Sequence, residues 1–323
     1  MKYKILFSVL VACPLFLVSC FKDTVYTNTV EGSMYMPQAV NDRNILTVTI
    51  KKEAQNVTFG TAYGGVNTFD KDIYVTYEID TSLVSTYNST NETSYLVIPD
   101  SAYSVSSLID TIPAGKTSSN SKTLTIQSSK LDYTSIGVKY LLPIRIKSVS
   151  DGVIDSTYGI TYFTIDSLYK QTLDVTSQGT LSVNIENING SNGANNSEGS
   201  SKLVDNSAST KYLIYNYSDG IEFWFMETFS EPIIVNLYTI TSANDADTRD
   251  IKEWEFQGSN DTTSAWTTLD YRSDETWSGR NVTNTYTFSN STAYMYYRVN
   301  VLKNNGATLV QIAEWRLLQY VVE

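Results

Sequence analysis

The chain has 323 residues, a formal net charge of −11, no histidine and two cysteines, a balance that excludes nucleic acid and anionic lipid as natural partners. Its length suits two domains, and 41% apolar residues are enough to bury two cores. The 24 tyrosines and 11 phenylalanines, together with many Thr, Val and Ile, favour strands over helices and predict an all-β protein.

The first twenty residues have the form of a secretory signal over 1–19. Lys2 and Lys4 precede an apolar run that is too short to span a membrane comfortably. The run ends in Leu-Val-Ser-Cys, which resembles a bacterial lipobox. Cleavage there would leave Cys20 as a lipidated first residue, so the membrane would be contacted through a lipid anchor only. The alternative is an ordinary cleaved signal in which Cys20 stands by chance.

Loss of the signal would also remove Cys13 and leave no thiol for a disulfide, a metal site or a nucleophile. Lys and Arg would fall from 23 to 21 against 34 Asp and Glu, a net charge of 21 − 34 = −13. Without histidine, acid–base catalysis needs paired carboxylates, and no nucleophile motif such as G-x-S-x-G is present. We therefore expect that the protein is not an enzyme.

The first half of the chain predicts a sandwich of short strands over 42–165, behind a polar tether over 20–41. In "DIYVTYEID", Ile73, Val75, Tyr77 and Ile79 fall on one face, as a half-buried strand requires. The stretches 123–127 and 140–150 repeat this alternation between turns rich in Gly, Asn and Ser.

Three blocks of this half, "YNSTNETSYLVIPDSAY", "TIPAGKTSS" and "YLLPIRIKSVS", resemble a domain found in surface lipoproteins of glycan-foraging Gram-negative bacteria, classified as domain of unknown function 1735. The resemblance covers about residues 40–165 and implies an immunoglobulin-like sandwich. It also implies a spacer near the outer membrane that is followed by a glycoside hydrolase or a sugar-binding module. The expected location is the outer membrane, lipid-anchored and facing the cell exterior.

Residues 166–200 include "NINGSNGANNSEGSS", whose density of Asn, Gly and Ser predicts a linker or long loop. The blocks that follow are "SKLVDNSASTKY", "DTRDIKEWEFQGSNDTTSAWTTLDYR", "YMYYRVNV" and "GATLVQIAEWRLL". In this order they resemble the coagulation factor 5/8 type C domain, also called the discoidin domain, whose galactose-binding-like jelly roll is shared by family 32 carbohydrate-binding modules. We assign this domain to 201–323, with a start that could lie near 175.

The stretch 253–272 could form part of a binding surface or only part of the scaffold that carries one. Trp254, Phe256 and Trp266 fall where the resembled family packs its core, and the turn at Asn260 and Asp261 has hairpin chemistry. We therefore expect this stretch to be scaffold.

The resemblance also implies a structural calcium site, because the family holds calcium with a loop of the form "KLVDNSASTKY" and a glutamate near the C-terminus. Carboxylate, carbonyl and hydroxyl oxygens are the donors that calcium takes. The residues carried over are Lys202, Asp205, Ser207, Thr210 and Glu314. The sequence departs at Asn206 and Ser207, where the family prefers Gly-Asp, and the alternative is a plain Asp turn without metal.

A ligand is expected at the loops of one end of the jelly roll. The candidate contact residues are Tyr215, Tyr217, Asn244, Asp247 and Arg249. Tyrosine offers an apolar ring face and a polar tip, as sugar recognition requires. Arg249 could instead brace its loop by pairing with Asp245 or Asp247. The family's galactose pocket, with its histidine, is absent from this chain.

Three functions are compatible with these patterns. The first is a non-catalytic glycan-binding lipoprotein of the cell surface that works beside an outer-membrane polysaccharide importer. The second is an adhesin or assembly subunit that binds a protein partner through the discoidin-like domain. The third is an enzyme, for which the sequence offers no catalytic constellation. The first agrees best with the anchor, the spacer and the sugar-binding fold, although a fold does not decide function on its own.

Overall fold

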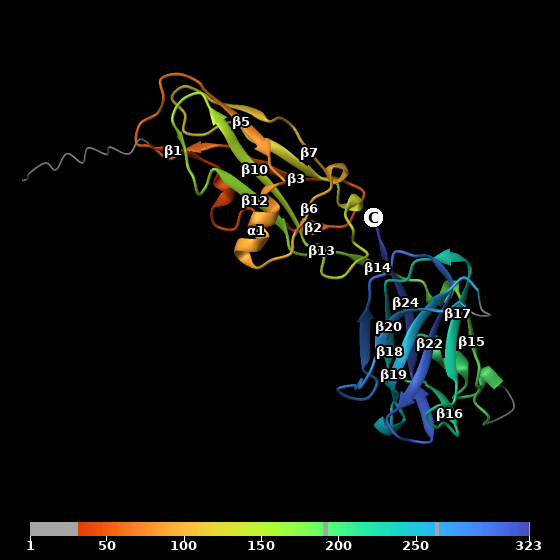
Figure 1. Ribbon diagram of the computed structural model, residues 1–323. Helices are drawn as coiled ribbons and strands as arrows, with labels where there is room; N and C mark the ends of the chain where they lie inside the picture. The colour runs from red at the N-terminus through yellow and green to blue at the C-terminus, as the bar shows by residue number, and fades with distance from the viewer. Residues whose placement is uncertain (1–31, 190–192, 262–264, 323) are drawn as a thin grey trace, which may run out of the picture.

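The computed structural model describes residues 32–189, 193–261 and 265–322. In this part of the chain two β-sandwiches form separate bodies (Figure 1), and α1 (Leu83–Asn91) is the only α-helix. The expected all-β fold class is therefore confirmed. The signal over 1–19 and the lipidation candidate Cys20 lie outside the described residues. Nowhere in the described ranges is a helix long and apolar enough to cross a membrane.

The N-terminal sandwich is built from two main sheets that pack face to face. One sheet runs in the order β12 (Ile160–Ile165), β10 (Tyr140–Val149), β5 (Ile73–Ile79), β8 (Ile109–Ile112), with β6 (Leu96–Val97) also paired to β10. The other runs in the order β3 (Gln55–Phe59), β9 (Lys122–Ile126), β7 (Tyr103–Val105). Smaller sheets are formed by β11 (Val153–Ile154), β1 (Ser33–Tyr35), β4 (Ala62–Tyr63), and by β13 (Leu168–Tyr169) with β2 (Val48–Thr49).

The alternation predicted for β5 is confirmed. Ile73, Val75 and Tyr77 are at most 2% exposed, whereas Tyr74 between them is 61% exposed. Phe59 of the opposite sheet meets the Tyr77 ring edge-on at 5.1 Å between centroids. This contact joins the two sheets across one hydrophobic core.

Part of the expected tether belongs to this core. β1 pairs with β4 and β11, and Met34 and Met36 are fully buried. The tether prediction for 20–41 was therefore wrong from residue 33 onward. Two buried methionines, one in the three-residue strand β1 and one just after it, are too few to give a periodic signal.

The helix α1 was not predicted because it has almost no apolar face. Val84 is the only one of its residues that is buried. The helix ends where Glu92 adopts the left-handed conformation, with φ of 54°. A helix with a single buried residue leaves no apolar pattern with a period of 3.6 residues in the sequence.

The C-terminal sandwich also has two main sheets, and all its strand pairs are antiparallel. One sheet runs in the order β15 (Thr180–Val183), β17 (Phe223–Ile233), β22 (Tyr294–Asn304), β19 (Ile251–Ser259), β20 (Thr267–Arg272). The other runs in the order β14 (Gln171–Asp174), β24 (Glu314–Val321), β18 (Leu237–Thr241), β21 (Thr283–Thr287). β16 (Tyr212–Tyr215) pairs with β23 (Leu309–Ile312).

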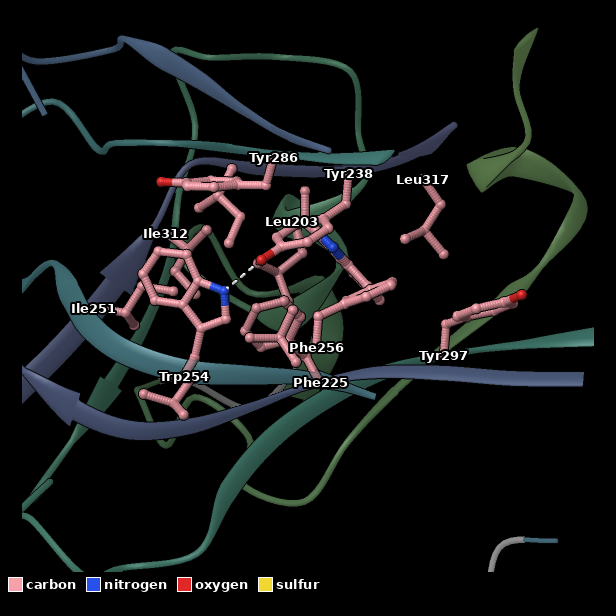
Figure 2. Close-up of a cluster of buried hydrophobic side chains, with 14 of the residues drawn as sticks. Leu203, Phe225, Tyr238, Ile251, Trp254, Phe256, Tyr286, Tyr297, Ile312 and Leu317 are labelled. Carbon is pink, nitrogen blue, oxygen red and sulfur yellow. Dashed lines mark hydrogen bonds between the residues drawn. The ribbon is translucent and has the colours of Figure 1, made fainter. Parts of the chain in front are cut away.

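Aromatic side chains from both sheets fill the core between them. Phe225 meets Trp315 edge-on at 4.9 Å between centroids, and Tyr238 stacks on Phe256 at 4.3 Å. Figure 2 shows the indole of Trp254 turned toward Tyr238 in the middle of this cluster. Along β22, the buried residues Tyr297, Val299 and Val301 alternate with the partly exposed Arg298 and Asn300. These contacts hold the two sheets together in a closely packed interior.

The range 166–200, expected to be a linker or loop, contains three strands, and this corrects the expectation. β13 belongs to the first sandwich, whereas β14 and β15 pair with β24 and β17 of the second. Val175 is 1% exposed within the second core. All four side chains of β14 are exposed, so the strand is held by backbone hydrogen bonds and leaves no alternating pattern to detect.

The pairing of β14 with the last strand brings the chain's entry and exit to the same end of the second sandwich. Gln171 pairs with Val321 at this end, while Thr241 pairs with Glu314 at the other end of β24. The ammonium group of Lys170 lies 4.4 Å from the centre of the Tyr320 ring and bonds the carbonyl of Ser135 at 3.4 Å. The loops that follow β18 therefore lie at the end away from this junction.

Candidate functional site at the loop end of the C-terminal sandwich

The loop predicted to hold calcium is organised around the buried carboxylate of Glu314 on β24. Its two oxygens accept the backbone N–H groups of Asn206 and Ser207, each at 3.1 Å. Asn206 has φ of 62°, a left-handed conformation that Gly or Asn adopts readily. Asparagine at this position therefore permits the left-handed turn of the loop.

The other predicted ligands lie in the same loop. The Thr210 hydroxyl donates to the Asp205 carboxylate at 2.9 Å and to the carbonyl of Ser207 at 3.1 Å. Lys202, within the 3₁₀ turn η6 (Ser200–Leu203), contacts Asp205 through its ammonium group at 3.5 Å. The structure therefore brings the four loop residues together with Glu314 of β24. Their carboxylate, carbonyl and hydroxyl oxygens are of the types that fit a hard cation.

The positive charges of Lys202 and Arg316 already compensate the carboxylates of Asp205 and Glu314. Arg316 donates to Glu314 at 3.1 Å, to the carbonyl of Val204 at 3.2 Å and to Asp174 at 2.8 Å. Burial raises the pKa of Glu314, although the N–H groups of the loop and the charge of Arg316 oppose the rise. The described residues hold no cluster of three or more His, Cys, Asp or Glu side chains of the kind that binds a metal. Calcium would have to rely on two carboxylates and on neutral oxygens.

A second charged network fixes the loop after β18. The carboxylate of Asp245 accepts Lys211 Nζ at 2.7 Å and Arg249 Nη1 at 3.3 Å. Arg249 ends the 3₁₀ turn η7 (Asp247–Arg249) and so braces its own loop. Arg280 donates to the carbonyl of Asp245 at 2.9 Å and makes a two-pronged ion pair with Asp250, which is 5% exposed. Fork geometry of this kind fixes both partners.

These charges border a small recess at the loop end. Its volume is about 70 Å³, roughly that of two water molecules in the liquid. The lining residues come from three loops: Asp247, Asp250, Glu275, Thr276, Trp277, Arg280 and Asn305. Trp277 is held in place because its Nε1 donates to the carbonyl of Ile240 at 3.3 Å and its ring lies parallel to that of Trp254. The recess combines a fixed aromatic ring with carboxylate, guanidinium and amide groups.

The predicted ligand contacts divide into two groups. Asp247 lines the recess, and Asn244 and Arg249 belong to the same loop. Tyr215 lies on β16, where its hydroxyl bonds the Asn189 side chain. Tyr217 is 2% exposed and packs against Phe223 in the core, so it cannot offer a ring face to a ligand. The prediction for Tyr217 is corrected, because a turn composition does not show which way its tyrosine points.

Several residues of the recess were missed in the sequence. Trp277 and Arg280 stand in "ETWSGR", and Asn305 stands in a short turn after β22. A tryptophan and an arginine inside a Gly- and Ser-containing turn are the signal that could have identified them.

The stretch 253–272 is scaffold only in part. Trp254 and Phe256 are fully buried, as predicted. Trp266 is half-buried on the outer side of the sheet, where the guanidinium carbon of Arg298 lies 4.0 Å from its ring centre. Its assignment to the core was wrong, because Trp266 stands before β20 and outside its alternation.

Most comparisons with known proteins address one half of the chain, and one structure covers nearly all of it. A family model whose description reads "-like, N-terminal domain" matches residues 23–153. No curated protein matches the chain. Among solved structures, a family 32 carbohydrate-binding module of NanJ from Clostridium perfringens, in complex with galactose, is 18% identical over 46% of this chain and 100% of its own, with a TM-score of 0.37.

Two structures from Bacteroides fragilis are also similar. An F5/8 type C domain is 13% identical over 47% of this chain and 98% of its own, with a TM-score of 0.39. A two-domain protein of unknown function is 10% identical over 90% of this chain and 95% of its own, with a TM-score of 0.35.

Proposed function

We propose that this protein is a non-catalytic glycan-binding lipoprotein of the outer-membrane surface, accessory to a polysaccharide uptake system. The recess beside Trp277 is the observation that carries the glycan-binding role. A fixed indole can meet the C–H face of a sugar ring, while neighbouring donors and acceptors bond its hydroxyls. At about 70 Å³ the recess suits the substituents of one sugar residue rather than a whole ring.

The polar groups around the recess match the dual character of a hydroxyl, which both donates and accepts. Arg280 supplies N–H donors, Asp247 and Glu275 supply acceptors, and the Asn305 amide supplies both. The ion pair of Arg280 with the buried Asp250 holds the guanidinium in place before any ligand arrives. Groups that are already held in place lose little conformational freedom when a ligand binds, which favours affinity.

The cellular part of the proposal rests on the sequence. The signal at 1–19 and Cys20 support a lipid anchor, and the blocks of the first half support a spacer domain. An outer-membrane importer complex is the proposed partner. Calcium, held by Asp205, Thr210 and Glu314 with the carbonyls of Lys202 and Ser207, would clamp the 201–210 loop to the last strand. Its role would be structural.

The test is a glycan array probed with soluble protein from residue 24 onward, with calcium and with chelator. Binding to one glycan class that is lost in Trp277→Ala supports the proposal. Tyr74→Ala is the matched control, because Tyr74 is a 61% exposed aromatic on the N-terminal sandwich and does not line the recess. A blank array with folded wild-type protein would overturn the glycan role and direct attention to a protein partner.

A further inference from the structure

A second feature of the C-terminal sandwich is the outer face of its five-stranded sheet. Two rows of directly paired residues cross four strands on this face. One row consists of Met226, Arg298, Gln257 and Thr268, and the other of Trp224, Asn300, Glu255 and Tyr271. Directly paired residues share a face of the sheet, and strands lie about 4.8 Å apart, so each row spans about 14 Å.

The two rows carry a connected polar network. Arg298 Nε donates to Gln257 Oε1 at 2.7 Å, and Gln257 Nε2 donates to Glu255 Oε2 at 2.7 Å. Asn300 Nδ2 reaches the same Glu255 oxygen at 3.4 Å. Gln257 is only 6% exposed although it points away from the core, because its neighbours on the face cover it. The network is therefore ordered in advance of any ligand.

Aromatic rings flank this network on both sides. Trp266 stacks against Arg298, and Trp224 lies opposite Asn300 on the neighbouring strand. Both tryptophans are half-buried, in contrast to the fully buried Trp254 and Trp315. A half-exposed tryptophan keeps part of its apolar surface available for contact.

A cavity of about 240 Å³ opens beside the rows, between the turn before β17 and the end of β22. Its lining includes Glu222, Arg298, Asn300 and Leu302. This volume equals that of roughly eight water molecules in the liquid. The cavity does not share any lining residue with the recess at the loop end.

We propose that this outer face is a second glycan-binding site, which takes a neutral polysaccharide chain laid across the strands. Arg298, Asn300 and Glu255 offer donors and acceptors to sugar hydroxyls, and Trp224 and Trp266 offer ring faces at the flanks. A protein partner fits the face less well, because protein interfaces have an apolar centre and a polar rim. Here the charged and polar groups occupy the centre.

This proposal goes beyond the glycan-binding role of the loop-end recess and concerns other residues. Affinity electrophoresis in native gels that contain galactan, mannan, xylan, β-glucan or starch measures both sites at once. Arg298→Ala, Asn300→Ala and Trp224→Ala are the variants of the face, and Trp277→Ala is the variant of the recess. Tyr74→Ala, an exposed aromatic on the N-terminal sandwich, is the control.

In a gel that retards the wild type, we expect each face variant to weaken the affinity about tenfold, while Trp277→Ala leaves a measurable retardation. Thermal melting shows whether each variant is folded, and the three substitutions lie on two different strands, so one misfolded variant does not remove the test. Retardation that is lost in Trp277→Ala and unchanged in all folded face variants would overturn the second site and leave the first intact. Retardation lost only in the face variants would support the second site and reject the recess. No retardation of the wild type in any gel would reject both.

Discussion

The indole Nε1 of Trp254 donates a hydrogen bond of 2.8 Å to the hydroxyl of Tyr238, at the centre of the C-terminal core. The same hydroxyl donates to the carboxylate of Asp270 at 2.9 Å. One oxygen thus satisfies a buried donor and a partly buried acceptor from two different strands; Figure 2 shows the first of these two bonds. This relationship explains how a core so rich in aromatic side chains can also contain polar atoms.

Tyr238→Phe should lower the free energy of unfolding by about 1–3 kcal/mol, because it leaves the Trp254 N–H without its acceptor in the core. Urea or guanidinium unfolding followed by circular dichroism measures the change. Tyr271→Phe removes a hydroxyl that bonds Glu253 at 2.7 Å on the exposed face and should change stability by less than about 0.5 kcal/mol. Equal effects of the two substitutions would contradict the role given to the buried hydroxyl.

Because of the buried carboxyl of Glu227, we expect the free energy of unfolding to fall as the pH rises. Burial raises the pKa of this carboxyl to about 8 from an ordinary value of 4.5. The folded protein then holds a proton that the unfolded chain releases, so the stabilisation is complete below pH 4.5 and is lost as the pH passes through about 8. In this window the loss is on the order of 1.4 kcal/mol per pH unit.

Glu227→Gln should flatten this part of the pH profile, since the amide has no proton to lose. Unfolding free energies measured between pH 5 and 9 test the prediction, with Glu231→Gln, an exposed position on the same strand, as the control. An unchanged slope in Glu227→Gln would assign the pH dependence to other groups.

Asp205→Ala and a calcium chelator should lower the melting temperature of the C-terminal sandwich by a similar amount, if calcium joins the 201–210 loop to Glu314. Differential scanning calorimetry with added calcium and with chelator measures both effects. Asp219→Ala, at an exposed position outside this loop, controls for the loss of one negative charge. A chelator without effect would show that Lys202 and Arg316 compensate the carboxylates without a metal.

Arg280→Lys should weaken glycan binding at the recess and lower the free energy of unfolding by about 1–3 kcal/mol. Lysine keeps the charge but cannot make the two-pronged contact with the buried Asp250 while also bonding the carbonyl of Asp245. Isothermal titration with the best glycan from the array, together with chemical unfolding, gives both quantities. Arg43→Lys, at an exposed position of the N-terminal sandwich, should change neither.

The sequence predicts the strands with a buried and an exposed face, because alternation is visible without tertiary information. β5 and β22 are of this kind. β14 could not be predicted, since backbone bonds to a strand far along the chain hold it and its side chains face solvent. The helix α1, with its single buried residue, gave no periodic signal either.

The candidate site, like the fold, was predictable only in part. The motif around Asp205 and Glu314 identified residues that the fold brings together from positions more than a hundred residues apart. The orientation of single aromatic side chains was not predictable. Tyr217 was expected to contact a ligand but is buried in the core, whereas Trp266 was expected in the core but packs against Arg298 on the outer side of the sheet. Composition indicates that a ring is present, whereas only packing decides whether the ring faces the core or solvent.

The pairing of β14 with β24 has a mechanical consequence. A pull between the N-terminal sandwich and a ligand held at the far loop end would draw β14 lengthwise along β24, because the chain enters at the Gln171–Val321 pair and the loops lie beyond Glu314. Under such shear the hydrogen bonds of the ladder bear the load together, whereas in peeling they would break one after another. The joint between the two bodies is therefore arranged to resist tension along the axis of these two strands.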